Sequence, residues 1–253
     1  VPPVSGSYPL FTYSGSKGTT FDPAVRHFLA TRTAVSLDET GTVGEVRLVV
    51  DAQAAQDLAW NPAVSATWDL GTSNWVDAVT RTVTDRFYEA DTVLFDDAGA
   101  ASNVINLATL VRPARVTVDA AADYTFAGAG RIGNPVLGAT SRLVKAGSGM
   151  LTVAVSNEFT GGTVISNGTV AVATAGALGT GAVTLDGGRL AGSGVSNTMA
   201  NAVAVNNAAS VIDDGGGSLT LTGLLGGPGG IVKTGPGLVN LHPASPNGYV
   251  GGT

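Results

Sequence analysis

Paired carboxylates are the residues of this sequence that come closest to a catalytic arrangement. Asp96-Asp97 and Asp213-Asp214 are adjacent pairs at the ends of segments with strand-like sequence. Two carboxylates on one face could cleave a glycosidic bond, but neighbouring residues of a strand point to opposite faces. Both pairs also precede glycine-containing turns, where aspartate commonly accepts backbone hydrogen bonds. We therefore predict turn caps and no catalytic residues, and the protein is not expected to be an enzyme.

The sequence offers no convincing cofactor or metal site either. Residues 128–133 match the pattern GxGxxG, but Asn134-Pro135 and strand-like sequence follow, where a nucleotide site needs a helix. His27 and His242 lie far apart in the sequence, and neither stands beside a nucleophile motif. Asp186 precedes two glycines, but without the nine-residue period of calcium-binding solenoids. We predict no cofactor and no metal.

The three tryptophans, Trp60, Trp68 and Trp75, permit two interpretations. Exposed indole faces could stack on sugar rings and so contact glycans. Alternatively, their spacing places them on neighbouring strands, where an aromatic cluster fills a wide or terminal section of a β core. The core interpretation is favoured, and glycan contact stays open as the alternative.

Composition limits the class of protein. The chain has 36 glycines among 253 residues and 13% charged residues, which is typical of short strands joined by tight turns. It has no cysteine, so disulfides and thiolate metal sites are excluded. Its net charge of −6, without a cluster of lysine or arginine, predicts no nucleic-acid or membrane partner. Because it opens on Val1-Pro2-Pro3, we expect a processed chain or a fragment.

Internal repetition predicts the architecture. The segment LVKAGSGMLTV at 143–153 matches IVKTGPGLVNL at 231–241, and NEFTGGT at 157–163 matches NGYVGGT at 247–253. Short alternating strands lie between these copies, separated by glycine, asparagine and aspartate. Such a pattern suits coils that stack and bury the face that each neighbour leaves open. The sequence predicts an all-β fold, a parallel β-helix of about ten rungs with coils of roughly 20 to 25 residues.

Two residue types recur within the repeat. We expect the glycines of the G-x-G motif, Gly147 and Gly149 in one copy and Gly235 and Gly237 in the other, at equivalent corners of different coils. There the backbone would turn sharply or pass close to the next rung. The repeated cation, present as Lys145 and Lys233, is interpreted as a solvated ladder that guards a sheet edge.

The chain is expected to have three parts. Residues 1–56 form a β segment that closes a preceding unit, with a short helix over Pro23–Ala30. Residues 57–140 form a tryptophan-containing β segment that leads into the solenoid. Residues 141–253 form the repeat coils. Gly251-Gly252-Thr253 falls within a repeat phrase, so further coils are expected to follow.

The repeat blocks resemble the autotransporter-associated β-strand repeat family. Its phrase has the form L-x-K-x-G-x-G-x-L-x-L followed by N-x-Y-x-G-G-T. The first copy fits at Leu143, Lys145, Gly147, Gly149, Leu151, Val153, Asn157, Phe159, Gly161, Gly162 and Thr163, and the second at Ile231, Lys233, Gly235, Gly237, Val239, Leu241, Asn247, Tyr249, Gly251, Gly252 and Thr253. Departures such as Phe159 for tyrosine are conservative. The stretches SYPLFTYSG at 7–15 and DTVLFDD at 91–97 also resemble segments near these repeats. The resemblance implies a β-helix passenger region of a large exported protein, extracellular or on the surface of a Gram-negative bacterium.

Two functions follow as expectations, with a third held as a remote alternative. The first is a structural role, as a spacer or as a self-assembling filament or surface-layer subunit whose partner is another copy of itself. The second is an adhesin that binds glycans or another cell surface. The remote alternative is a polysaccharide-degrading β-helix enzyme.

Overall fold

The computed structural model describes residues 4–15, 26–27, 30–41 and 43–252. These residues form strands and short 3-10 helices, which confirms the all-β class. The chain divides into two compact units, Val1–Gln56 and Asp57–Thr253. Most of the helix predicted over Pro23–Ala30 lies outside the described residues, although Arg26–His27 within it form a strand, β2. Within the described residues, no helix has the length and apolar character needed to cross a membrane.

The first unit is a four-stranded antiparallel sheet of order β1-β4-β3-β2. Val46 and Val50 on β4 are its buried aliphatic side chains among the described residues. The strands are β1 (Gly6–Thr12), β2 (Arg26–His27), β3 (Ala34–Asp38) and β4 (Glu45–Asp51).

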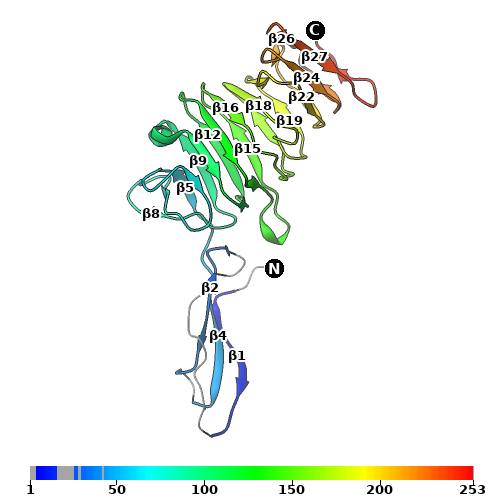
Figure 1. The fold of residues 1–253 in the computed structure, drawn as a ribbon. Coiled ribbons are helices and arrows are strands. Elements are labelled where there is room, and N and C mark those ends of the chain that lie inside the picture. The colour runs from blue at the N-terminus through cyan, green and yellow to red at the C-terminus, as the bar shows by residue number, and fades with distance from the viewer. Residues whose placement is uncertain (1–3, 16–25, 28–29, 42, 253) are drawn as a thin grey trace. The chain divides into compact units, whose positions relative to one another are not determined.

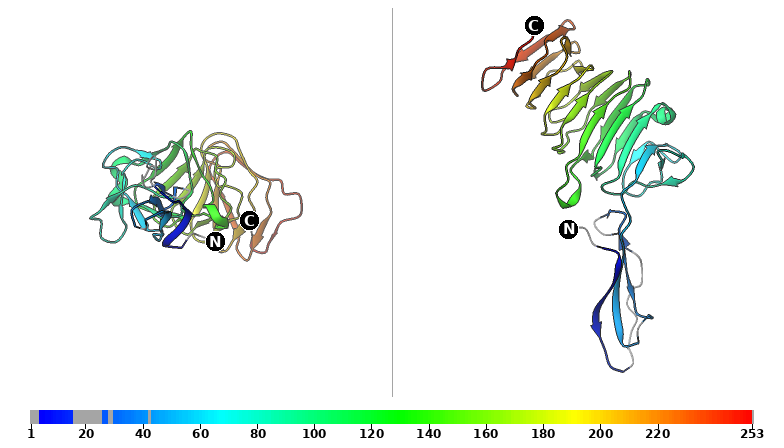
Figure 2. Two further views of the ribbon diagram at one scale, coloured as in Figure 1. Left: turned by 90° about the horizontal axis from the view of Figure 1, so that it is seen from below. Right: turned by 180° about the vertical axis from the view of Figure 1, so that it is seen from behind.

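The second unit is a parallel β-solenoid whose strands stack into walls (Figures 1 and 2). The first wall is an eleven-stranded sheet: β5 (Asp57–Trp60), β7 (Trp75–Asp77), β8 (Thr84–Asp85), β9 (Thr92–Asp96), β12 (Arg115–Asp119), β15 (Arg142–Lys145), β17 (Thr163–Ile165), β19 (Val183–Leu185), β22 (Val203–Val205), β25 (Leu225–Gly227) and β28 (Gly248–Tyr249). The second wall is an eight-stranded sheet: β6 (Thr67–Trp68), β10 (Val104–Leu107), β13 (Tyr124–Gly128), β16 (Met150–Val153), β18 (Thr169–Val172), β20 (Arg189–Gly192), β23 (Ser210–Asp213) and β26 (Ile231–Thr234).

Two shorter sheets complete the solenoid. One pairs β11 (Leu110–Val111) with β14 (Arg131–Ile132). The other, called the third wall below, consists of β21 (Asn197–Met199), β24 (Ser218–Leu221) and β27 (Leu238–Leu241). The 3-10 helices are η2 (Asp97–Ser102), which follows β9, and η3 (Val136–Gly138), which precedes β15.

Register shows that the coils differ in length. Thr163, Val183 and Val203 stand one above the other in the first wall, so the two turns that join them are equally long. The turn from Val116 to Leu143 is longer, because the connection through η3 lies within it. The solenoid has about seven turns. The expected ten was too many, since the described strands before residue 57 form a separate antiparallel sheet and some coils are longer than predicted.

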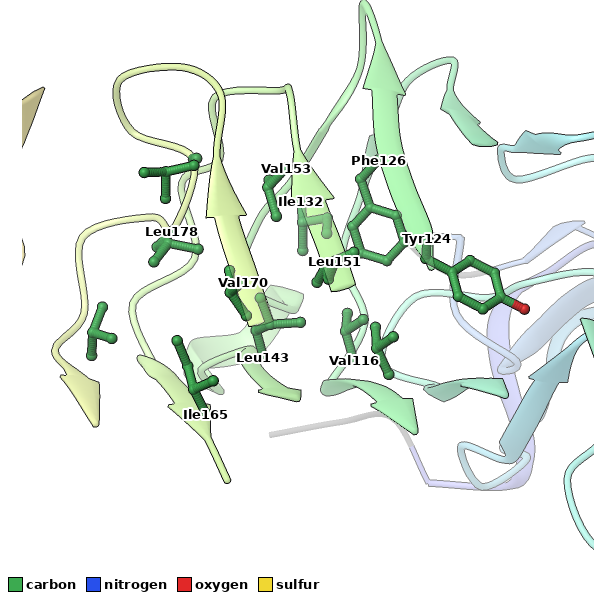
Figure 3. Close-up of a cluster of buried hydrophobic side chains, with 14 of the residues drawn as sticks. Val116, Tyr124, Phe126, Ile132, Leu143, Leu151, Val153, Ile165, Val170 and Leu178 are labelled. Atoms are coloured by element: carbon green, nitrogen blue, oxygen red, sulfur yellow. The ribbon is translucent and has the colours of Figure 1, made fainter. Parts of the chain in front are cut away.

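Aliphatic side chains from facing walls fill the interior. Figure 3 shows Val116, Leu143 and Ile165 of the first wall facing Leu151 and Val170 of the second. All five side chains are at most 3% exposed. Because side chains alternate along a strand, residues between them, such as Thr117 and Thr152, point outward. Each turn therefore depends on its neighbours for burial.

The first wall is closed at its N-terminal end by antiparallel strands. β5 pairs in parallel with β9 on one side and antiparallel with β7 on the other, and β7 pairs antiparallel with the short strand β8. A short terminal strand offers few free backbone groups to another chain. This end of the wall is therefore not a bare parallel edge.

Candidate functional site

The tryptophans lie inside the first coils of the solenoid. Trp60, Trp68 and Trp75 each have no exposed surface. The ring centroid of Trp75 lies 5.1 Å from that of Trp60 and 5.3 Å from that of Trp68, both edge to face. Phe87 and Phe95 complete the cluster, with centroids 5.5 Å from Trp68. Edge-to-face rings at these distances attract one another beyond the effect of burial.

This burial corrects the glycan-contact alternative for Trp60, Trp68 and Trp75. A sugar ring stacks on an exposed aromatic face, and none of the three indoles presents one. The rings fill the interior where the first coils are wide, which was the interpretation that the sequence favoured.

The two repeat copies occupy different corners, which corrects the expectation of equivalent ones. In the first copy, β15 lies in the first wall and β16 in the second. In the second copy, β26 lies in the second wall and β27 in the third. The same phrase therefore makes the corner between whichever two walls it joins.

The repeat lysines cap these corners, in contrast to the solvated ladder predicted. Lys145 is fully buried, and its Nζ donates to the carbonyl oxygen of Gly147. Burial lowers the pKa of Lys145, while nearby acidic side chains oppose this effect. Lys233 is more exposed, and its Nζ donates to the carbonyls of Gly235 and Gly237 at 2.6 and 2.7 Å. Each ammonium thus folds back over its own G-x-G turn.

Close approach of neighbouring coils explains why glycine stands at these corners. A Cβ on Gly149 would lie 2.3 Å from the carbonyl oxygen of Ala122, and one on Gly237 would lie 2.0 Å from that of Gly217. Gly235 additionally has a φ of +85°, which favours glycine. The N-x-Y-x-G-G-T motif shows the same crowding at its first glycine, because a Cβ on Gly161 or Gly251 would lie 2.4 Å from a backbone oxygen. Its second glycine differs between the copies: Gly162 has a φ of +82°, whereas a Cβ on Gly252 would meet nothing within 4 Å.

Replacing Gly149 with valine should destabilise its coil by about 1 to 3 kcal/mol, because the side chain would press on the Ala122 carbonyl. Hydrogen exchange should show loss of protection around β13 and β16, with protection of β22 and β24 retained, since coils contact only their neighbours. Met150→Val is the matched control, because Met150 is 38% exposed. Unchanged protection, or one-step unfolding of the whole solenoid, would contradict this mechanism.

The aspartate pairs are caps, as the sequence favours. Asp97 accepts from the backbone N–H groups of the next coil, with Oδ1 2.8 Å from Ala122 N and Oδ2 3.1 Å from Ala121 N. Its partner Asp96 caps η2 and pairs with Arg81. Hydrogen bonds from these N–H groups lower the pKa of Asp97.

The second pair caps a later corner in the same way. Asp214 Oδ1 accepts from Gly216 N at 2.7 Å and from Gly237 N at 2.8 Å, and its Oδ2 lies 2.7 Å from Lys233 Nζ. The Lys233 hydrogen bond is the main cause that lowers the pKa of Asp214. These contacts account for both pairs as links between successive coils.

The remaining motifs stay apart or form strands. Residues 128–133 run from the end of β13 through β14 without a helix. His27 lies in the first unit and His242 in the second. Over the part of the chain that the structure describes, no group of three or more His, Cys, Asp or Glu side chains is arranged to hold a metal ion.

A groove of about 490 Å³ lies on the outer face of the second wall, across β16, β18, β20 and β23. Its lining residues are Met150, Thr152, Thr169, Ala171, Arg189, Ala191, Gly192, Ser193, Asp213 and Gly215. Small side chains line the middle and an ion pair borders it, with Arg189 Nη1 3.1 Å from Asp213 Oδ2. This is the candidate binding surface of the solenoid.

Sequence reasoning missed this groove, although a signal was present. Ala171 and Ala191 pair with one another across the equivalent strands TVAV and RLAG. They alternate with the core residues Val170 and Leu190, so they lie on the outer side of the strand, where they are 3% and 6% exposed. Two consecutive coils with alanine at an outward position mark a hollow. Recognising it requires the strand register, which the sequence did not supply.

Comparison with known proteins agrees with this architecture. A stacked-coil solenoid closed by glycine corners defines the class as a repeat-built β-helix. Residues 143–172 match the family model of the passenger-associated-transport-repeat. An adhesin from Brucella suis biovar 1 (strain 1330), described as "Adhesin BmaC autotransporter", is 30% identical over 275 residues, which cover 93% of this chain and 8% of that protein. No solved structure matches the chain.

The chain belongs to the autotransporter passenger-repeat family, which confirms the resemblance of its repeat phrase. It spans 8% of the length of the curated relative that it matches. The comparisons support an exported β-helix protein of the cell surface.

Proposed function

We propose that this chain is a surface-exposed part of a bacterial autotransporter adhesin, in which the solenoid holds binding surfaces away from the cell. The observation that carries the proposal is the unbroken parallel ladder of the second wall, eight strands in register. Similarity to an autotransporter adhesin supports the adhesive role.

Hydrogen bonds from each coil to the next make the solenoid a continuous support. Neighbouring coils are joined by backbone hydrogen bonds along the walls and by the Asp97 and Asp214 caps that reach from one coil to the next. A scaffold of this kind needs no catalytic centre, and the carboxylate pairs already serve as caps.

End-to-end self-assembly has less support than a display role. Stacking of copies through a bare sheet edge at the N-terminal end of the solenoid would use the end strand of each wall. In the first wall, β7 and β8 run antiparallel to their neighbours, and β8 consists of Thr84–Asp85 alone. In the second wall, the end strand β6 pairs in parallel with β10 but consists of Thr67–Trp68 alone.

Antibodies raised against residues 57–253 test the proposal on the bacterium that encodes the chain. They should label intact cells without permeabilisation, and deletion of residues 57–253 from the gene should reduce attachment of the cells to host-cell layers. Labelling that requires permeabilisation, or attachment unchanged by the deletion, would contradict a role as an exposed adhesin segment.

A further inference from the structure

We infer that the groove across β16, β18, β20 and β23 binds a linear neutral saccharide that lies along the solenoid axis. The inference deepens the proposed adhesive function and rests on it for its biological meaning. The binding surface differs from the buried tryptophan cluster, and it is built from outward side chains of four successive coils.

Strand register arranges the groove as two rows of side chains. One row runs Thr152, Ala171, Ala191, Asp213, each residue paired with the next in the adjacent coil. The other row runs Met150, Thr169, Arg189. Because the first row shrinks to two alanines between Thr152 and Asp213, the surface is hollow there.

A recessed apolar floor beside an exposed thioether suits the C–H face of a sugar ring. Ala171 and Ala191 form the floor and are only 3% and 6% exposed, so the larger apolar contact comes from Met150, which is 38% exposed and carries a polarisable thioether. The described residues that line the groove include no aromatic ring, so we expect weak binding that depends on several sugar units together.

The rim suits hydroxyl groups that both donate and accept. Arg189 is 44% exposed, and the guanidinium carries five N–H donors. Asp213 is the one side-chain acceptor that Arg189 has among the described residues. Thr169, beside Arg189 in the second row, and Thr152, at the end of the first row away from Asp213, add further hydroxyls around the hollow.

Charge balance favours a neutral ligand over an acidic one. The positive charge of Arg189 is matched by Asp213, and Thr234 and Gly215 also donate to that carboxylate at 2.6 and 2.8 Å. Hydrogen bonding, first that from Thr234, lowers the pKa of Asp213, which keeps the carboxylate ionised at neutral pH. An acidic sugar would meet this negative charge.

Coil spacing matches the ligand's repeat. Parallel strands stand about 4.8 Å apart, which is close to the advance of one pyranose ring in an extended polysaccharide. The rows from Thr152 to Asp213 include three such steps, so the groove accommodates about three sugar units.

Titration of the full isotope-labelled chain tests the inference. The probes are neutral linear hexasaccharides of glucose, mannose and galactose, with an oligogalacturonate of equal length for comparison. At least one neutral probe should shift the amide signals of β18 and β20 at millimolar concentration. Ala191→Leu, which fills the hollow, should abolish the shifts. Arg189→Ala should weaken binding about tenfold, as expected for a lost hydrogen bond to a charged group.

Thr125→Leu is the matched control, because Thr125 is the outward neighbour of Thr152 in the preceding coil and does not line the groove. It should leave binding unchanged, and circular dichroism and the amide spectrum should show that each variant is folded. Three results would overturn the inference: no shifts with any neutral probe, tighter binding of the oligogalacturonate, or binding that Ala191→Leu does not affect. Self-association removed by Ala191→Leu, without saccharide binding, would instead assign the groove to a second copy.

A negative titration would not overturn the proposed adhesin role, because the titration uses purified protein and the role is tested separately by labelling intact cells. Conversely, saccharide binding by a protein that never reaches the cell surface would uphold the groove and overturn the adhesin assignment.

Discussion

Trp68→Ala should lower the free energy of unfolding of the solenoid's first coils by about 3 to 5 kcal/mol. The indole is fully buried, and its ring lies within 5.5 Å of Trp75, Phe87 and Phe95, centroid to centroid. Removing it leaves a cavity that these rigid rings cannot close. Chemical denaturation followed by near-ultraviolet circular dichroism measures the loss, because the aromatic cluster dominates that signal.

Trp68→Phe is the matched control and should cost far less. It keeps most of the apolar contact, and it removes an indole N–H that has no hydrogen-bond acceptor among the described residues. If Trp68→Ala left stability unchanged and reduced saccharide binding instead, the buried position of Trp68 would be wrong.

Glu89→Gln should stabilise the protein by about 3 kcal/mol at pH 8 and by nothing near pH 4. Glu89 is 2% exposed, and burial raises its pKa from 4.5 to about 7, against the attraction of Arg112 at 3.8 Å. Below pH 4.5 the carboxyl is neutral in both folded and unfolded chains. Between pH 4.5 and 7 the unfolded chain loses this proton while the folded chain keeps it, so stability falls as pH rises.

Glutamine stays neutral, so the variant avoids this loss. Denaturation midpoints of wild type and Glu89→Gln, measured from pH 4 to 8, should diverge as pH rises. Glu158→Gln is the control, because Glu158 is 47% exposed and pairs with Arg131 on the surface, where the contribution is small. A constant difference between wild type and Glu89→Gln across this range would contradict the assigned titration.

The capping aspartates respond to pH in the opposite direction. Hydrogen bonds depress the pKa values of Asp97 and Asp214, so their contribution is present above about pH 4 and is lost as pH falls through the lowered values. Acid therefore weakens the links between coils. The same acid conditions remove the cost of burying the charged form of Glu89, because its carboxyl is then neutral.

Much of the solenoid could be predicted from the sequence because its determinants are local. Alternation in segments such as RVTVD predicts strands with an inner and an outer face, and the repeat phrase predicts stacking. The glycines could be recognised for the same reason: Gly149 stands where a neighbouring backbone passes. These properties follow from short sequence patterns.

The rest required knowledge of which residues become neighbours across coils. Lys145 looks like a surface cation in sequence, and its burial depends on the fold of its own turn and on the coil that covers it. The hollow at Ala171 and Ala191 depends on which residues pair across neighbouring coils, and this register changes with the length of each turn. Local sequence shows neither the coil that covers Lys145 nor the register between coils.

The corner motif has a consequence for how such chains diversify. From β15 through β17, β19 and β22 to β25 the chain makes four turns, and it then advances to the second wall before the phrase recurs at β26. The interval between copies is therefore not a whole number of turns. Unequal crossing-over between copies would add or remove that interval and rotate everything downstream by one wall. Gain or loss of a repeat would thus rotate the downstream coils about the solenoid axis, so that their outer surfaces face another side. It would also change how far along the axis these surfaces lie from the altered repeat.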